Sequence, residues 1–361
     1  VRYIQPNSDA STKEVKRGYV FNAIDGVQLT IDNYQSLLDK DTYTMNFADL
    51  NGGNPISNGK SVTLTKAEYP ENPVFITKTF EIGGKKIGYL MYNSFTSTYD
   101  QQLNAAFAQL KTEGATDLIL DLRYNGGGSV QTSVYLASMI TGQFNGQLFA
   151  KERWNTELQS WFEANHPDWI VNNFENQIYK EDSNGNVIVQ EPINSLNLSK
   201  LYVITTSSSA SASELIINGL KPYIDVVTIG TTTSGKYTGS ITLYDSDTFG
   251  RNGANLNPRH TWAIQPIVLE TVNKLGANDK DGFEPTIEQV EYVSEFQELG
   301  LVTEPLLAKA IQQIVPSSKT PINKKPSVLM VEFKSFTGES KYNTGMYIDK
   351  ELPKDFVRSI K

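Results

Sequence analysis

A serine and a lysine near the middle of the chain have the types and the spacing that acyl transfer requires. Ser211 follows a short apolar run at 201–204, typical of a buried strand, and precedes an apolar segment with helical spacing at 212–221. A second strand rich in Val and Ile, at 225–230, leads towards Lys236. The helix rises only about 15 Å, and an extended return covers about 3.3 Å per residue, so Lys236 can come back level with Ser211. The pair is therefore a candidate nucleophile and general base.

The same serine also has a purely structural interpretation. Ser211 and Glu214 fit a capping box, in which a serine caps the helix and a glutamate three residues later caps the serine. Most serines that precede a helix are only caps. Small residues nevertheless crowd the turn at 205–213 beyond what a cap requires, and such crowding lets a substrate backbone approach. Spacing alone leaves both interpretations open.

The turn resembles the nucleophile region of the C-terminal processing peptidases, also called tail-specific proteases. Their pattern is Ser-Ala-Ser-Ala-Ser-Glu, with a lysine base 25 residues after the middle serine in a Gly-Lys loop, and residues 209–214 with Gly235 and Lys236 reproduce it. The resemblance implies that Ser211 is the nucleophile and Lys236 the base. A free lysine has a pKa near 10.4, so the base must be buried to be neutral near pH 7–8.

A glycine triplet follows the buried strand at 117–122 and leads into another helical segment. It lacks both the GxGxxG spacing and a following Lys-Ser/Thr, which argues against a nucleotide loop. Close approach of the backbone to a substrate carbonyl fits better. The processing peptidases carry Asp-Leu-Arg-x-Asn-x-Gly-Gly here, so the resemblance implies that the backbone N–H groups of Gly127 and Ala212 form an oxyanion hole.

Other residues of these motifs are expected to support the site. Asp121 and Arg123, with Asn125 and Gly128, are expected to hold the glycine loop rather than to react. The family usually continues Gly-Lys-Gly-x-x-Gln, in which the glutamine helps to orient the lysine. In this chain Ser240 stands at that position, and a shorter serine would need a water bridge to reach the amine.

Composition excludes several other kinds of function. The net charge of −8 and the sequence pI near 5.0 argue against a nucleic-acid partner. No apolar run approaches the roughly 20 residues of a membrane span, and the first residues lack signal-peptide anatomy. Membrane association is thus expected only through an N-terminus absent from this chain. With no cysteine and only His166 and His260, neither in a metal-ligand spacing, no metal or cofactor is expected and a His-based triad is disfavoured.

Strands alternate with helices along the middle of the chain, which predicts an α/β (α+β) fold. The resemblance implies a ClpP/crotonase-like core at 71–315 and a partial PDZ-like domain at 1–70. Composition rich in Ser, Pro and Lys after the core predicts a linker, followed by a small extension, at 316–361. The extension carries strand-like runs at 328–333 and 346–348. The aromatic segment at 150–200 is expected to be a packing cluster rather than a lid over the site.

The resemblance implies a serine endopeptidase that acts on C-terminal or unfolded segments of proteins. Family members work in bacterial envelopes or plastid lumens, so a periplasmic or envelope location is expected, with the export signal outside this chain. One alternative is a weak or inactive peptide- or ligand-binding protein on the same fold. Another is a PDZ scaffold whose core only positions a partner. The sequence gives no indication of the oligomeric state.

Overall fold

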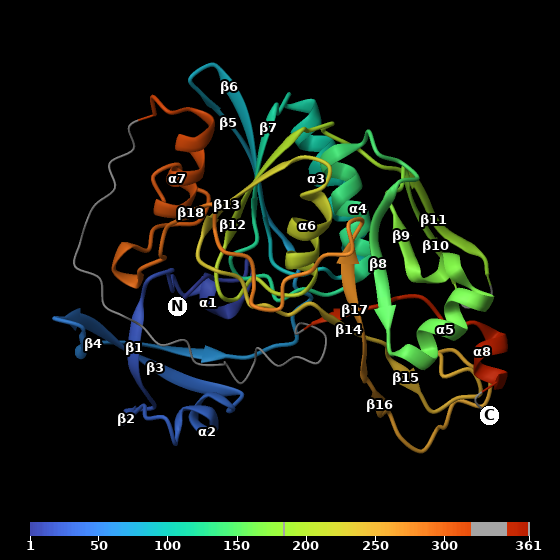
Figure 1. The fold of residues 1–361 in the computed structure, drawn as a ribbon. Coiled ribbons are helices and arrows are strands. Elements are labelled where there is room, and N and C mark those ends of the chain that lie inside the picture. Colours follow the sequence, from blue (N-terminus) through green and yellow to red (C-terminus); the bar gives the residue numbers. More distant parts are fainter. Residues whose placement is uncertain (183–184, 319–344, 360–361) are drawn as a thin grey trace. The chain divides into compact units, whose positions relative to one another are not determined.

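The computed structural model describes residues 1–182, 185–318 and 345–359 (Figure 1). The chain forms two compact units. The first contains Val1–Asn72 and Val290–Ser340, and the second contains Pro73–Gln289 and Lys341–Lys361. Within the described residues, every helix is too short or too polar to cross a bilayer.

The first unit is built on an antiparallel sheet of four strands in the order β2-β1-β3-β4. The turn at Asp25 and Gly26 has positive φ at both residues, as the tight hairpin between β1 and β2 requires. Five buried apolar side chains form its core: Val15, Ile24, Met45, Phe47 and Leu64. Its elements are α1 (Asp9–Thr12), β1 (Val20–Ile24), β2 (Val27–Gln28), α2 (Tyr34–Leu38), β3 (Thr42–Asn51), β4 (Asn54–Thr65), η3 (Val293–Glu295) and α7 (Pro305–Ile314).

Contacts far apart in the sequence make the units differ from the expected domains at two points. Residues 290–318 group with the first unit and not with the core, because Arg17 forms an ion pair with Glu291 at 2.7 Å and stacks on the ring of Phe296. Residues 345–359 group with the second unit and do not form a separate extension. The strand-like run at 328–333 lies outside the described residues, and the PDZ-like interpretation of 1–70 stays a prediction.

The second unit contains a six-stranded sheet, within the described residues, in the order β18-β13-β12-β7-β6-β5. All neighbours from β18 to β6 are parallel, and only the hairpin of β5 and β6 is antiparallel. This arrangement confirms the predicted α/β fold. The strands are β5 (Val74–Ile82), β6 (Lys85–Tyr92), β7 (Asp117–Asp121), β12 (Lys200–Thr205), β13 (Asp225–Gly230) and β18 (Ile287–Glu288).

Three helices connect these parallel strands, because a parallel pair needs a crossover. They are α3 (Asp100–Thr112), α4 (Val130–Thr141) and α6 (Ala212–Leu220). Every residue of α6 is buried, and the main apolar core joins this helix to α3, α4 and the sheet. The loops after β7, β12 and β13 leave the same edge of the sheet, since the strands run in one direction. These loops carry the glycine triplet, Ser211 and Lys236.

A second, five-stranded sheet of the same unit has the order β19-β14-β17-β8-β9. Its strands are β8 (Leu148–Trp154), β9 (Val171–Asn173), β14 (Thr238–Ser240), β17 (Ile267–Asn273) and β19 (Met346–Tyr347). The remaining elements are η1 (Ser97–Tyr99), α5 (Thr156–Asn165), η2 (Pro167–Ile170), β10 (Gln177–Glu181), β11 (Val187–Pro192), β15 (Leu243–Tyr244), β16 (Ala263–Ile264) and α8 (Lys354–Ser359).

The aromatic residues around α5 pack on one another, which confirms the predicted packing cluster. The rings of Phe162 and Trp169 are stacked with centroids 4.7 Å apart, and Trp154 lies 5.0 Å from Phe162. Phe356 of α8 stacks on the same group, 5.5 Å from Phe162. The cluster therefore anchors the end of the chain to the second unit.

Candidate active site

The motif at 209–214, where the turn after β12 enters α6, contains three serines, and the structure separates their roles. Ser209 donates its hydroxyl to the carbonyl of Leu122 at 2.8 Å, and Ser213 donates to the carbonyl of Asn125 at 2.9 Å. The hydroxyl of Ser211 is buried and has no hydrogen-bond partner among the described residues. Of the three, only Ser211 has an oxygen that the fold does not use.

The backbone of Ser211 is strained, with φ 63° and ψ −111°. A residue with a side chain rarely adopts this conformation, which costs of order 1–3 kcal/mol and persists where the surroundings enforce it. A serine on a sharp, strained turn from a strand to a helix is the geometry of a nucleophile elbow. The Ser211 hydroxyl accepts no hydrogen bond from the first turn of α6, whereas the Glu214 carboxylate accepts the N–H of Ser211. Only the glutamate half of the predicted capping box is therefore hydrogen-bonded.

The other half of that box is Glu214, whose buried carboxylate joins two loops. It accepts the N–H of Ser211 at 2.7 Å, the N–H of Gly235 at 2.6 Å and the N–H of Lys236 at 2.9 Å. It also accepts the hydroxyl of Thr233 at 2.6 Å. The backbones of the serine turn and the lysine loop are thus held together by one side chain, a role that the sequence motif alone did not reveal.

Lys236 follows β13 on a loop and is half-buried. Burial lowers the pKa of its amine below the ordinary 10.5, in the direction that a general base requires. A Cβ added to Gly345 would overlap the Lys236 Nζ, so the amine lies against the backbone of that glycine. Because the Ser211 hydroxyl has no partner, the structure brings the two loops together without joining the two side chains.

The glycine loop faces Ser211 at very short range. A Cβ on Gly127, whose φ is 108°, would lie 2.7 Å from the Cβ of Ser211 and 3.0 Å from the nitrogen of Ala212, so a glycine is required. The N–H of Ala212 is in the first turn of α6 and has no acceptor among the described residues. The N–H of Gly127 instead donates to Asn125 Oδ1 at 2.9 Å. One of the two expected oxyanion donors is therefore available here, and the other is engaged.

Asn125 is fully buried and connects the glycine loop to its surroundings. Its Nδ2 donates to the carbonyl of Tyr92 at 2.8 Å, and its own carbonyl accepts the N–H of Ala210 at 3.0 Å. Gly128 has φ 138°, and a Cβ there would overlap the carbonyl of Phe95. Both residues thus lie where a supporting role would place them.

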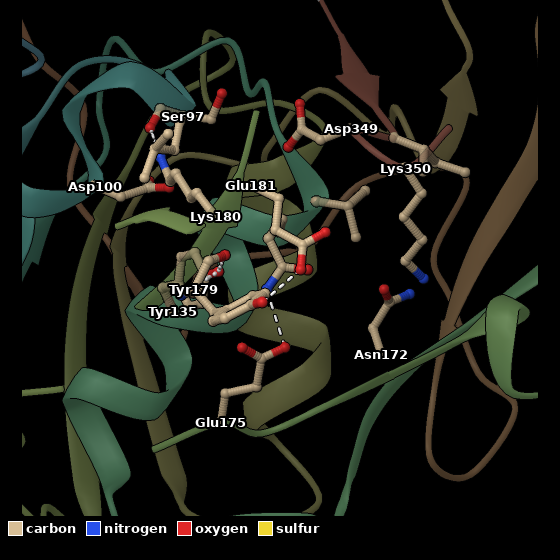
Figure 2. A pocket seen from close by; sticks show the side chains of 14 residues that line it. Ser97, Asp100, Tyr135, Asn172, Glu175, Tyr179, Lys180, Glu181, Asp349 and Lys350 are labelled. Atoms are coloured by element: carbon tan, nitrogen blue, oxygen red, sulfur yellow. Dashed lines mark hydrogen bonds and ion pairs between the residues drawn. The ribbon is translucent and has the colours of Figure 1, made fainter. Parts of the chain in front are cut away.

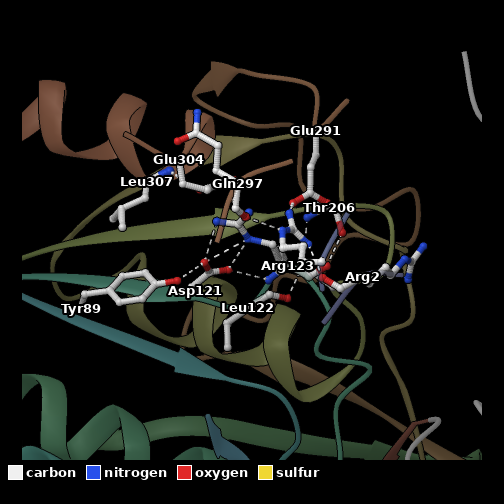
Figure 3. Close-up of polar contacts among 12 residues, drawn as sticks. Arg2, Tyr89, Asp121, Leu122, Arg123, Thr206, Glu291, Gln297, Glu304 and Leu307 are labelled. Atoms are coloured by element: carbon white, nitrogen blue, oxygen red, sulfur yellow. Dashed lines mark hydrogen bonds and ion pairs between the residues drawn. The ribbon is translucent and has the colours of Figure 1, made fainter. Parts of the chain in front are cut away.

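Asp121 and Arg123 form a buried ion pair at the end of β7, with Arg123 Nη2 2.8 Å from Asp121 Oδ2 (Figure 3). Both side chains are fully buried, and the hydroxyl of Tyr89 also donates to Asp121 at 2.7 Å. The Thr206 hydroxyl donates to the Arg123 carbonyl, which links this network to the serine turn. These contacts position the loops and do not face the Ser211 hydroxyl.

Ser240, expected to support Lys236, instead donates its hydroxyl to the carbonyl of Met346 at 3.1 Å. A small pocket adjoins Ser211, and its other walls come from the start of α6, from β17 and from two loops. They are Glu214, Leu215, Asn218, Tyr237, Thr271, Asn278, Asp279 and Phe283.

The two histidines lie on the surface, away from this site. His166 contacts Asp355 at 2.8 Å, and His260 contacts Asp245 at 3.2 Å. In the part of the chain that the structure describes, no group of three or more His, Cys, Asp and Glu side chains is arranged to hold a metal.

The part of the chain that carries this site is similar to known peptidases. The model of peptidase family S41 matches residues 86–258. The carboxyl-terminal-processing protease of Picosynechococcus is 25% identical over 177 residues, 49% of this chain and 35% of that protein. The chloroplastic C-terminal processing peptidase of Tetradesmus obliquus is 24% identical over 243 residues, 64% of this chain and 46% of that protein. The chain thus spans between a third and a half of these relatives.

A crystal structure from Bacteroides fragilis assigned to the S41 proteases is similar over most of the chain. Its TM-score is 0.68 at 27% identity, and the match covers 88% of this chain and 78% of that one. The matched family segment contains the glycine loop, the nucleophile turn and the lysine loop. The residues that build the candidate site on the glycine, nucleophile and lysine loops are therefore all within the part of the chain that is similar to peptidase family S41.

Proposed function

We propose that the chain is a serine peptidase that hydrolyses peptide bonds through an acyl-enzyme on Ser211, with Lys236 as the general base. The observation that carries the proposal is the state of Ser211: a strained residue at a helix N-terminus, with a hydroxyl that forms no bond to the fold. The short distance to Gly127 and the shared anchoring of both loops by Glu214 support it.

In the proposed reaction, the Ser211 oxygen attacks the substrate carbonyl carbon while its proton passes to the neutral amine of Lys236. The carbonyl oxygen becomes an oxyanion, which the N–H of Ala212 stabilises together with the N–H of Gly127 once Gly127 releases Asn125. The carbon–nitrogen bond then breaks, and the leaving amine takes the proton from Lys236. Water attacks the ester by the same route and frees Ser211.

The proposed substrates are protein or peptide chains, and in particular C-terminal or unfolded segments of exported proteins. The names of the two relatives, a carboxyl-terminal-processing protease and a C-terminal processing peptidase, support this substrate class. We extend the proposal to a location in the bacterial envelope or periplasm on the same basis. It requires no metal or cofactor.

A second candidate is a peptide-binding protein without turnover. Two observations favour it: the Ser211 hydroxyl has no hydrogen-bond partner among the described residues, so it is not bonded to the Lys236 amine, and the N–H of Gly127 is engaged by Asn125. Neither feature is compatible with reaction until the side chains move.

A serine-directed fluorophosphonate probe tests the proposal. We expect covalent labelling of the native chain and none of Ser211→Ala. The matched control is Ser213→Ala, which removes a neighbouring hydroxyl that is bonded to Asn125, and it should still be labelled. Labelling that survives in Ser211→Ala would remove the assigned nucleophile. Unlabelled native chain that still binds peptides would favour the second candidate.

A further inference from the structure

Residues 345–349, here called the C-terminal segment, lie between the two loops that a substrate must contact. On one side the segment pairs in parallel with β14, which begins at Thr238, just after Lys236. On the other side Tyr347 bridges to Ser129, directly after the glycine triplet. A stretch of the chain distant in sequence therefore runs along the candidate active site.

The segment uses the kind of contacts that an extended peptide makes when it adds to a sheet edge. Tyr347 donates its N–H to the carbonyl of Gly128 at 3.1 Å, and Ile348 donates its N–H to the carbonyl of Ser240 at 3.0 Å. The hydroxyl of Ser240 donates in turn to the carbonyl of Met346. Such main-chain bonds are independent of side-chain type, and strand addition is a common mode of peptide recognition.

The segment also contacts the proposed general base. Gly345 lies against the Lys236 amine, and the Ser211 hydroxyl is buried and unpaired among the described residues. A substrate cannot reach Ser211 in this arrangement, and the amine contacts the segment where the reaction would require it to contact the serine.

The side chain of Met346 contacts one residue that lines the small pocket beside the nucleophile. Met346 is buried, and its sulfur lies 3.8 Å from the hydroxyl of Thr271, which lines that pocket together with Ser211 and Phe283. The segment therefore occupies the backbone slot and also approaches the adjacent side-chain position with an apolar residue.

The continuation of the segment lines a larger cavity of about 440 Å³ (Figure 2). Ile348, Asp349 and Lys350 form one wall of it, and Asp349 accepts a hydrogen bond from the Ser129 hydroxyl. Beyond it the chain is anchored separately, because Lys350 donates to the carbonyl of Trp169 at 2.8 Å.

We propose that residues 345–349 are an intramolecular occupant of the substrate slot, and that an extended peptide with an apolar side chain binds in their place when they are displaced. The inference rests on the proposed function for its catalytic consequence, but the slot itself can be tested by binding alone. The alternative is that β19 is a permanent strand of the sheet.

A reversible lock tests the proposal, and the chain suits it because it has no cysteine of its own. Ser240 and Tyr347 are paired neighbours on β14 and β19, so Ser240→Cys with Tyr347→Cys places two thiols within the range of a disulfide. We expect Ser211-dependent fluorophosphonate labelling to be at least about tenfold slower in the oxidised protein than in the same protein after reduction. Equal rates in the two states would overturn the proposal.

A second variant opens the slot without a crosslink. Tyr347→Pro removes the N–H that Gly128 accepts, whereas the control Tyr347→Phe keeps it. We expect labelling to be several-fold faster in the proline variant than in the control. A proline variant that melts at a lower temperature and labels no faster would identify β19 as a permanent strand.

A binding measurement separates failure of this inference from failure of the proposed function. A fluorescent peptide with the sequence of residues 345–349, Gly-Met-Tyr-Ile-Asp, is titrated into Tyr347→Pro and into the oxidised lock, and anisotropy is followed. Saturable binding to the first and none to the second supports the occupied slot even where no variant is labelled, which would count against the peptidase alone. No binding to the proline variant would overturn the slot itself.

Discussion

The nucleophile turn and the lysine loop of this molecule share one backbone anchor, but the side chains of Ser211 and Lys236 have different surroundings. Glu214 fixes the backbone of both. On the serine side, the hydroxyls of Ser209 and Ser213 donate to backbone carbonyls, and the Ser211 oxygen has no hydrogen-bond partner among the described residues. On the lysine side, the amine lies against Gly345 of another part of the chain. The surroundings of the proposed nucleophile are thus set by local contacts, whereas the amine of the proposed base lies against a segment that is distant in the sequence.

The largest effect should come from removing the base while leaving the serine turn intact. Lys236→Met keeps most of the unbranched side chain and the backbone N–H that Glu214 accepts, but it removes the amine. We expect the rate of fluorophosphonate labelling at Ser211 to fall by about a hundred- to ten-thousandfold, the range for a general base.

Lys236→Arg is the matched control, because guanidinium stays protonated and cannot accept the serine proton. The arginine variant should be as slow as the methionine variant. Labelling near the native rate in either variant would mean that another group activates the serine.

A substitution in the glycine loop, which faces Ser211, tests the serine side of the comparison. Gly127→Ala places a Cβ 2.7 Å from the Cβ of Ser211 at a backbone angle that alanine disfavours. We expect labelling to fall by about a hundredfold or more, as for loss of an oxyanion donor. Gly146→Ala is the control, since it shares a positive φ but has open space around it, and it should label normally. Equal labelling of both variants would refute the close approach.

Loss of the shared anchor should affect both loops at once. Glu214→Ala leaves one buried and two part-buried N–H groups without their acceptor, so we expect a loss of about 3 kcal/mol in the free energy of unfolding, measured by urea denaturation. Labelling should fall by about a hundredfold, because small misplacements of reacting groups cost that much.

Glu214→Gln is the graded control for this anchor. It keeps one carbonyl acceptor and the shape of the side chain, so its losses in stability and in labelling should be smaller. If the alanine variant is as stable as the native chain, Glu214 does not hold the loops together.

The smallest change is a change of pH, which acts on the lysine side alone. The neutral amine of Lys236 accepts the serine proton, so the labelling rate should rise about tenfold per pH unit below its pKa and level off above it. Because burial lowers the pKa of Lys236, the midpoint should lie below 10.5. The measurement is a labelling rate over pH 6–11. A rate that is independent of pH, or a midpoint at 10.5 or above, would contradict a buried base.

Local patterns in the sequence were sufficient to predict the parts of the site that depend on one turn. The strand before Ser211, the helix after it and the return strand before Lys236 lie where apolar periodicity indicated. Parallel strands bring their carboxyl ends to one edge, so the approach of the two loops followed from the order of the elements.

Contacts between distant segments have no such local signal. The run at 346–348 was identified as strand-like, but nothing in its composition indicates β14 as its partner. For the same reason the position of Ser240 against Met346 and the grouping of residues 290–318 with the first unit differ from expectation. The hydrogen bond from the Gly127 N–H to Asn125 Oδ1 depends on the conformation of the Asn125 side chain, which the spacing of residues does not predict.

The covalent tether of the C-terminal segment has a kinetic consequence. A docked segment that belongs to the same chain competes at a local concentration that dilution does not change, on the order of millimolar for tethered groups. A free peptide at micromolar concentration would rarely displace the segment, whereas a chain end that is held near the slot would displace it often. The choice between substrates would then depend on how long each substrate stays near the slot.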